Sequence, residues 1–277
     1  MILLNGRELS EKKIPELKAK VSELNGTPQL AIIQVGTLNE STVYIRRKVE
    51  YANEIGAKAQ VAHFSDKVTL EEIQSKIKTL NEDKNIHGII VQLPLPERLN
   101  TYEILNTISP EKDVDGLTAL NLYKLLTDQG NALIPATAKG IVSLLNNYDI
   151  EVAGKNIVIV GHSFSVGKPI ALSLMNTGAT VTICHSMTED LKVHTKKADI
   201  LISAVGKPGL ITKKHVSKDQ VIVDVGITLV NGRLHGDVDF KEVKDSVHAI
   251  TPVPGGIGPM TVVSLFENLL QAYKTLS

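Results

Sequence analysis

The stretch Asn156-Ile-Val-Ile-Val160-Gly161-His-Ser-Phe-Ser-Val-Gly167-Lys-Pro169 decides the fold class of this sequence. An apolar, β-branched run leads through a glycine-containing turn into a helical pattern that extends to Thr177. Such a turn places backbone N–H groups and the positive end of a helix where they can bind a phosphate. The full fingerprint Gly-x-Gly-x-x-Gly is absent, since Ser163 occupies the second glycine position, so an ordinary tight turn is the alternative interpretation.

The same alternation of apolar runs and amphipathic stretches extends over most of the chain. It is typical of a parallel sheet whose two faces are both covered by helices. The predicted strands are Gln29–Val35, Ala59–Phe64, Gly88–Gln92, Asn156–Val160, Thr180–Cys184, Ile200–Ala204 and Gln220–Val225. The predicted fold class is therefore α/β with parallel sheet.

Helix boundaries are indicated by local residues. A helix is expected over Asn39–Ile55, with Gly56 placed to end it. Another begins after Thr69, where Glu72 completes a capping box. The last helix is expected over Pro259–Leu276 and has proline at a favourable first position.

The pattern predicts two domains. Between residues 93 and 137 the alternation gives way to proline-containing loops and two short helices, and a new series begins at Asn156. We predict a first domain over residues 1–137 and a second, Rossmann-like domain over residues 138–258. The helix Ala138–Asn147 connects them, and the final segment, residues 259–277, is expected to pack back on the first domain.

Composition narrows the class of protein. The chain has 277 residues with 30 basic and 30 acidic side chains, so no charge excess indicates a nucleic-acid or membrane partner. The single cysteine, Cys184, excludes an internal disulfide and a cysteine-rich metal site, and is expected to be a small buried apolar residue. No basic, apolar leader with a cleavage site begins the chain. We expect a cytoplasmic protein that acts on a small molecule without a metal.

The end of the predicted strand Thr180–Cys184 indicates the cofactor. NAD-binding domains usually place an acidic residue here to bind the ribose 2′-hydroxyl, but this chain has Cys184-His185-Ser186. A carboxylate would repel a 2′-phosphate, whereas imidazole and hydroxyl groups can bind one. NADP is therefore predicted rather than NAD, with an ordinary polar turn as the alternative for His185 and Ser186.

Two later strand ends carry turn-forming residues. Val205-Gly206 follows one strand, and Asp224-Val-Gly226-Ile227 follows the next. Ligands of open α/β sheets bind at the carboxyl ends of strands, so both turns are expected to approach the nicotinamide half of the cofactor. Strand-to-loop geometry that demands glycine is the alternative.

The predicted first domain carries reactive side chains. Tyr44 and Lys48 lie four residues apart on one helix face, where they can transfer protons if burial lowers the lysine pKa. Such a pair is more commonly an ordinary amphipathic surface. Gln92 ends an apolar strand and is placed to enter a cleft or cap a loop. Asp115 precedes Gly116, and an Asx turn or a helix start is its alternative role.

Six segments, in order, resemble the bifunctional methylenetetrahydrofolate dehydrogenase/methenyltetrahydrofolate cyclohydrolase family. The matching segments are Ser41–Lys48, Gly88–Pro96, Lys112–Gly116, Gly161–Pro169, Asp224–Ile227 and Thr251–Thr261. The last, Thr251-Pro-Val-Pro-Gly-Gly-Ile-Gly-Pro-Met-Thr261, is the most specific because so dense a proline and glycine string is improbable in an ordinary loop.

The resemblance implies an enzyme of one-carbon metabolism that acts as a cytoplasmic homodimer and contributes to purine biosynthesis. It would oxidise 5,10-methylenetetrahydrofolate with NADP and hydrolyse the methenyl product to 10-formyltetrahydrofolate. It makes Lys48 the essential catalytic group, assisted by Tyr44, Gln92 and Asp115. The substrate-binding residues are then Tyr44, Gln92, Leu93, Asp115, Pro254, Gly255, Gly256 and Gly258.

The cofactor-binding residues follow from the turns and the resemblance together. They are Thr137, Gly161, His162, Ser163, Val166, Gly167, His185, Ser186, Val205, Gly206, Asp224, Gly226 and Ile227. The family often has arginine where this chain has His162, and histidine binds phosphate strongly only when protonated. NADP binding is therefore expected to depend on pH.

Two other functions are compatible with parts of the sequence. One is a different NADP-linked dehydrogenase, similar to shikimate dehydrogenase, which has no need for the Pro254–Gly258 loop. The other is a non-catalytic regulator that binds a dinucleotide. The presence of Tyr44, Lys48, Gln92 and Asp115 argues against that regulator.

Overall fold

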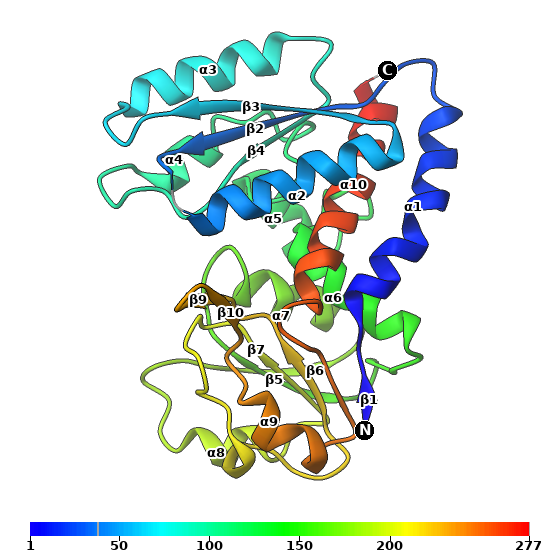
Figure 1. Cartoon of the computed structure of the whole chain (residues 1–277), viewed down its shortest axis with the longest axis vertical. Helices are drawn as coiled ribbons and strands as arrows, with labels where there is room; N and C mark the ends of the chain where they lie inside the picture. The colour runs from blue at the N-terminus through cyan, green and yellow to red at the C-terminus, as the bar shows by residue number, and fades with distance from the viewer. Residues whose placement is uncertain (38, 277) are drawn as a thin grey trace. The chain divides into compact units, whose positions relative to one another are not determined.

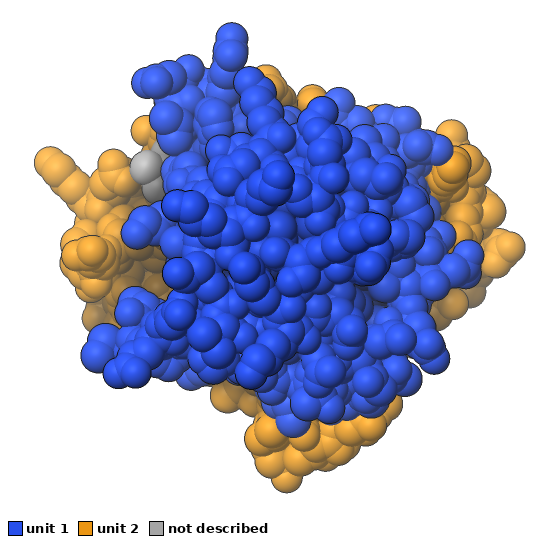
Figure 2. Space-filling view, turned by 90° about the horizontal axis from the view of Figure 1, so that it is seen from below, with its two compact units in different colours: residues 1–11, 137–261 blue, residues 12–136, 262–277 orange. Residues whose placement is uncertain are grey.

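The computed structural model describes residues 1–37 and 39–276, without the side chains of residues 39–41, so Ser41 of the first matching segment lies outside the described side chains. The chain forms two compact units, coloured separately in Figure 2. Unit 1 comprises residues 1–11 and 137–261, and unit 2 comprises residues 12–136 and 262–277. Residues 1–11 thus belong with the later part of the chain rather than with the first domain, because β1 (Ile2–Leu3) pairs with β11 (Ala249–Ile250).

Unit 2 is built on a three-stranded parallel sheet of order β3-β2-β4. Its strands are β2 (Gln29–Val35), β3 (Lys58–Phe64) and β4 (Gly88–Val91). Helices α2 and α3 lie on opposite sides of the sheet (Figure 1). The helices of this unit are α2 (Asn39–Ile55), α3 (Leu70–Glu82), α4 (Thr101–Leu105) and α5 (Ala119–Leu126), with most of α1 (Gly6–Ser22) and α10 (Ile257–Leu276).

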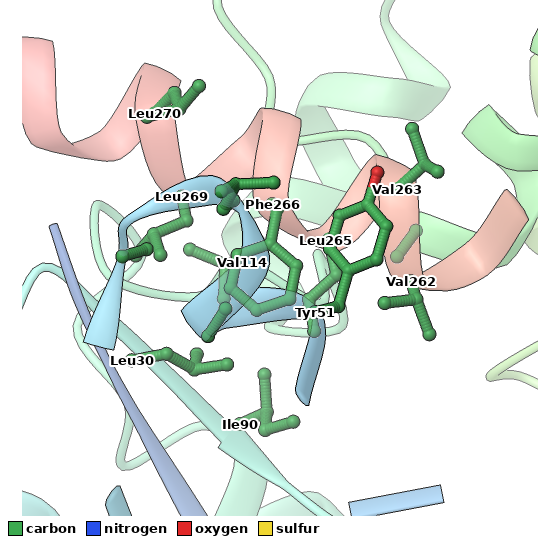
Figure 3. Close-up of a cluster of buried hydrophobic side chains, with 14 of the residues drawn as sticks. Leu30, Tyr51, Ile90, Val114, Val262, Val263, Leu265, Phe266, Leu269 and Leu270 are labelled. Atoms are coloured by element: carbon green, nitrogen blue, oxygen red, sulfur yellow. The ribbon is translucent and has the colours of Figure 1, made fainter. Parts of the chain in front are cut away.

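The core of unit 2 joins the sheet to the last helix (Figure 3). Leu30 and Ile90 project from β2 and β4 toward α10, whose Phe266 is fully buried. The rings of Phe266 and Tyr51 of α2 have centroids 5.5 Å apart. The last helix therefore supplies part of the core beneath α2 and β4, the two elements that lead to Lys48 and Gln92.

Unit 1 contains a six-stranded, entirely parallel sheet of order β1-β11-β8-β7-β5-β6. Its longer strands are β5 (Asn156–Val160), β6 (Thr180–Cys184), β7 (Ile200–Ser203) and β8 (Val221–Asp224). Strand β5 lies between β6 and β7, so the strand order reverses there, which is the position where open α/β sheets bind ligands.

Short elements complete unit 1. An antiparallel hairpin is formed by β9 (Thr228–Val230) and β10 (Arg233–His235). The helices are α6 (Ala136–Asn147), α7 (Gly167–Asn176), α8 (Leu191–Thr195) and α9 (Phe240–Val243), with 3-10 turns η1 (Lys213–His215) and η2 (Lys244–Ser246).

Most predicted boundaries agree with the structure to within two residues. Gly56 follows α2 with a φ of 83°, and the capping box of Thr69 and Glu72 is present. The expectation that every strand is covered on both faces is wrong for β3 and β6. Both are edge strands with several exposed residues, because only one neighbouring strand flanks each of them.

Candidate functional site

Lys48 and Gln92 are in direct contact in unit 2. The α2 helix carries Lys48, and β4 leads into Gln92, whose backbone N–H donates to the carbonyl oxygen of Ile33 at 2.8 Å. The Gln92 side-chain amide donates through Nε2 to the carbonyl oxygen of Leu93 at 2.9 Å. Its Oε1 therefore faces Lys48 and accepts a hydrogen bond from Nζ at 2.9 Å. Gln92 is thus hydrogen-bonded to the lysine that the resemblance makes catalytic.

Burial and a neighbouring charge have opposite effects on the pKa of Lys48. Lys48 is half-buried, and desolvation of its ammonium group lowers its pKa, while the negative charge of Asp115 partly opposes the effect. The same burial raises the pKa of Asp115, against the influence of Lys48. Tyr44 lies one helical turn before Lys48 and is half-buried. Unit 2 therefore contains a desolvated amine next to a desolvated carboxylate.

The turn that holds Asp115 is shaped by its neighbour Asp113, which is 1% exposed. The Asp113 carboxylate accepts hydrogen bonds from the N–H groups of Gly116 at 2.9 Å and Thr118 at 2.8 Å. It also accepts one from Nδ2 of Asn121 at 2.9 Å. The Asx-type turn considered for Asp115 is thus made by Asp113. Among the described residues, none donates a hydrogen bond to the carboxylate of Asp115.

Two further side chains fix this segment. Nζ of Lys112 donates to the carbonyl oxygens of Leu80, Asn81 and Asp83 at the end of α3, at 3.1, 2.7 and 2.8 Å. From α10, the fully buried Asn268 donates to the carbonyl oxygen of Val114, the residue before Asp115, at 2.9 Å and to that of Ile134 at 2.8 Å. Asp115 is therefore presented by a rigid backbone.

Unit 1 contains the predicted dinucleotide turn in a compact form. Gly161 has a φ of 120°, and a side chain on Gly167 would overlap the carbonyl oxygen of Gly161. The hydroxyl of Ser163 accepts from the N–H groups of Val166 at 3.2 Å and Gly167 at 3.3 Å. The chain therefore turns tightly from β5 into the N-terminus of α7, and only glycine fits at position 167. The turn fits a dinucleotide phosphate.

The residues expected near the 2′-phosphate cluster at the ends of β5 and β6. The rings of His162 and His185 have centroids 4.8 Å apart, and both side chains are exposed, as are Ser186 and Lys168. Nδ1 of His185 accepts the N–H of Met187 at 3.2 Å, so a proton at Nδ1 would break this bond. His162 is the member of the pair that this bond does not restrict. Cys184 is fully buried, as predicted, and burial raises the pKa of its thiol.

The turns after β7 and β8 also lie in unit 1. Val205 and Gly206 are exposed or half-exposed, and Gly206 has a φ of 71°. Asp224 is 3% exposed, and its carboxylate accepts backbone N–H groups, including that of Gly226 at 3.2 Å. Burial raises the pKa of Asp224 to about 7. Ile227 is half-buried immediately after this turn.

The predicted substrate loop belongs to unit 1. Gly255 accepts a hydrogen bond at its carbonyl oxygen from the N–H of Arg7 at 2.9 Å. The loop continues into α10, whose first turn contains Gly258. Near the loop, the hydroxyls of Thr137 and Thr261 are 3.4 Å apart. The structure thus groups Tyr44, Lys48, Gln92, Leu93 and Asp115 in unit 2, and the residues from Thr137 to Gly258 in unit 1.

Sequence reasoning missed three buried polar residues. Asp113, Asp237 and Asn268 each bond to backbone groups that flank predicted site residues. Asp113 lies within the matching segment Lys112–Gly116, whereas Asp237 and Asn268 have side-chain partners that are distant in sequence. Across residues 1–37 and 39–276, no cluster of three His, Cys, Asp or Glu side chains is placed to hold a metal ion. No helix within the same residues could cross a membrane.

Two family models match the chain. Residues 4–115 match the catalytic domain of tetrahydrofolate dehydrogenase/cyclohydrolase, and residues 135–277 match its NAD(P)-binding domain. The bifunctional protein FolD of Sulfurihydrogenibium sp. is 46% identical over 279 residues, covering 99% of this chain and 98% of the relative. FolD of Aquifex aeolicus is 43% identical, covering 99% of this chain and 95% of the relative.

Solved structures agree with these matches. The bifunctional FolD dehydrogenase/cyclohydrolase of Campylobacter jejuni has a TM-score of 0.96 at 42% identity, with 99% of each chain covered. The Trypanosoma brucei FolD, in complex with NADP and an inhibitor, has a TM-score of 0.95 at 34% identity, covering 99% of this chain and 98% of the other. A shikimate dehydrogenase from Aquifex aeolicus has a TM-score of 0.53 at 12% identity, which indicates a shared fold alone.

Proposed function

This chain belongs to the tetrahydrofolate dehydrogenase/cyclohydrolase family, and we propose on that basis that it catalyses both reactions of the bifunctional enzymes. It oxidises 5,10-methylenetetrahydrofolate to the 5,10-methenyl cation with NADP, and then hydrolyses that cation to 10-formyltetrahydrofolate. The observation that carries the proposal is the hydrogen bond between Lys48 and Gln92, in a desolvated environment shared with the carboxylate of Asp115.

Oxidation requires alignment rather than an acid or base. NADP, when bound, accepts a hydride from the bridging carbon of the folate. The turn from Gly161 to Gly167, which leads into the N-terminus of α7, binds the phosphates, and Ser186 binds the 2′-phosphate together with His162, whose ring lies beside that of His185. Asp115 hydrogen-bonds the nitrogen edge of the pterin ring and holds the bridging carbon in a reactive orientation.

Hydrolysis assigns a proton transfer to Lys48. As water attacks the cationic bridging carbon, one water proton passes to the neutral form of Nζ of Lys48, which burial favours by lowering the pKa. Nζ returns a proton to the ring nitrogen as the carbon–nitrogen bond breaks. The remaining hydroxyl proton leaves to solvent as the formyl carbonyl forms. Gln92 directs the Nζ lone pair by occupying one N–H of the amine.

The loop containing Pro254, Gly255, Gly256 and Gly258 lines the folate in this proposal, together with Tyr44 and Leu93. The enzyme acts as a homodimer in the cytoplasm and provides one-carbon units for purine biosynthesis. This part of the proposal is supported by the resemblance to the bifunctional family and by a net charge of zero, which offers no electrostatic attraction to nucleic acid.

The proposal is tested by assaying each half-reaction by itself. Incubation with 5,10-methylenetetrahydrofolate and NADP is expected to produce the methenyl and NADPH absorbances, and purified methenyltetrahydrofolate is expected to lose its absorbance without cofactor. A protein that reduces dehydroshikimate with NADPH but leaves both folates unchanged would refute the assignment. A protein that binds NADP without either folate reaction would be a regulator instead.

A further inference from the structure

Asp237 is a fully buried carboxylate outside the predicted site, located between β10 and α9. Its Oδ2 accepts hydrogen bonds from Oγ of Ser203 at 2.9 Å and from the N–H of Val205 at 2.7 Å. Its Oδ1 accepts the N–H of Lys207 at 2.7 Å. Both oxygens are therefore bonded to one short segment, the loop that follows β7.

Asp237 is also joined to the turn after β8. Its own N–H donates to Oδ1 of Asp224 at 3.0 Å, and the next N–H, that of Val238, donates to Oδ2 at 2.9 Å. A side chain on Gly226 would overlap the Asp237 carboxylate, and one on Gly236 would overlap that of Asp224. Each carboxylate thus packs directly against a glycine of the other's segment. We call these residues, with Ser203, Val205 and Lys207, the Asp237 network.

The Asp237 network extends to the dinucleotide turn. Ala204 lies between Ser203 and Val205, and its N–H donates to the carbonyl oxygen of Val160 at 2.8 Å. A Cβ on Gly161 would overlap the carbonyl oxygen of Ala204. The loop held by Asp237 is consequently packed against the first glycine of the phosphate-binding turn, at the reversal of strand order.

Burying a carboxylate is costly unless its oxygens are fully hydrogen-bonded. In Asp237 this requirement is met by one hydroxyl and two backbone N–H groups of a single short segment. Replacing the carboxylate by an amide would leave one acceptor oxygen and turn an NH2 group toward the donors of this segment, which would release the loop from its fixed conformation.

We propose that Asp237 is the positioning residue for the nicotinamide half of the cofactor site. It fixes the loop containing Val205 and the turn containing Gly226 in one arrangement, against which the nicotinamide end of the dinucleotide binds. The inference rests on the proposed function, since it assumes that these turns bind NADP. It assigns no part in hydrolysis to Asp237, because the hydrolytic groups belong to unit 2.

The test compares Asp237→Asn with Asp199→Asn. Asp199 lies at the opposite end of the same sheet, where its carboxylate accepts the N–H of Asn156 at 2.8 Å. For each full-length protein we would measure the dissociation constant of NADP by titration, the KM for NADP in oxidation, and kcat for hydrolysis of methenyltetrahydrofolate. Asp237→Asn is expected to raise both NADP constants by about tenfold, equivalent to about 1.4 kcal/mol, with hydrolysis within about twofold of the unaltered protein.

Asp199→Asn is expected to leave all three quantities unchanged. If Asp237→Asn does not fold, Ser203→Ala removes a single donor to Asp237 and is expected to raise the NADP constants by a smaller factor in the same direction. Unchanged NADP constants in Asp237→Asn would overturn the proposal, and so would an equal loss of NADP binding and hydrolysis. Absence of both folate reactions in the unaltered protein would refute the proposed function, while the NADP titration would still decide the role of Asp237.

Discussion

Asp115 in unit 2 and Asp237 in unit 1 are both desolvated carboxylates, but their surroundings differ. Asp237 accepts three hydrogen bonds, two of them from backbone N–H groups. Asp115 has no donor to its carboxylate among the residues described, and burial raises its pKa. A carboxylate whose oxygens are all bonded fixes the backbone around it, whereas one left without donors keeps its bonding capacity for a ligand. The difference separates residues that shape a site from residues that act in it.

The largest effect is expected at Lys48. Lys48→Met should reduce hydrolysis of methenyltetrahydrofolate by about 10²–10⁴-fold, the range for loss of a general base, while the NADP dissociation constant changes little. Lys48→Arg is the matched control, because it retains the charge but cannot become a neutral base. The rate of hydrolysis would be measured at one saturating substrate concentration. Equal rates in the unaltered protein and in both variants would show that Lys48 takes no part in the reaction.

The pH dependence of stability tests the buried carboxylates of unit 1. Burial raises the folded-state pKa of Asp224 to about 7, above the value of about 3.9 for an unfolded chain. The folded protein then binds more protons than the unfolded one between these values, so this group lowers stability as pH rises from about 4 to 7. Asp224→Asn abolishes this dependence. The free energy of unfolding of Asp224→Asn minus that of the unaltered protein should therefore increase by about 1.4 kcal/mol for each unit of pH between about 4 and 7.

Urea denaturation at pH 4, 5, 6 and 7 would measure this difference. The loss of hydrogen bonds to Gly226, Asp237 and Val238 contributes a constant offset and does not change its slope. A difference that does not vary with pH would mean that Asp224 is ionised at all four pH values. The backbone N–H groups, which lower the pKa of Asp224, would then outweigh desolvation, which raises it.

Asp115→Ala tests the opposite kind of carboxylate. It should weaken folate binding by about 1.5–3 kcal/mol, the usual contribution of a hydrogen bond to a charged group, and leave NADP binding unchanged. Asp113→Asn offers a comparison, because Asp113 shapes the turn without being available to the ligand. Calorimetry would measure the folate dissociation constant of both variants. If Asp113→Asn alters this constant and Asp115→Ala does not, the two roles are reversed.

The smallest effect is expected in cofactor preference. We predict that NADP is preferred over NAD and that the preference decreases from pH 6 to pH 8, because imidazole ordinarily loses its proton near pH 6.5. His162→Ala should lower the preference at pH 6 and remove its pH dependence. Dissociation constants of both cofactors at three pH values would check this. A pH-independent preference would instead identify Lys168 as the source of positive charge, and a preference for NAD at each pH would contradict the choice of cofactor.

Local patterns were sufficient to predict most of the fold and to single out candidate residues for the site. Strand β5 and helix α2 have the boundaries that periodicity predicts, because their apolar spacing is set by their own burial. The two-residue strands β1 and β11 were missed, since so short a strand has no periodicity and is defined only by its partner. The exposure of β3 and β6 likewise depends on their positions at sheet edges.

The same limit applies to the site. Lys48 and Asp115 were identifiable because each lies in a distinctive segment. Asp237 and Asn268 were not, because the hydrogen-bond partners of their side chains lie 30 or more residues away in the chain. Polar residues of this kind resemble ordinary loop or helix-surface residues until the tertiary structure shows what surrounds them.

The division of α10 between the two units has a consequence for synthesis of the protein. Its first turns belong to unit 1, but Phe266 and Leu269 are fully buried in the core of unit 2, next to Leu30 from near the start of the chain. On the ribosome, the strands and helices of unit 2 emerge long before the helix that completes their core. Unit 2 must therefore wait until α10 has been synthesised, with apolar surface exposed in the meantime. For the same reason, neither unit can be expressed as a complete module by a single cut of the gene.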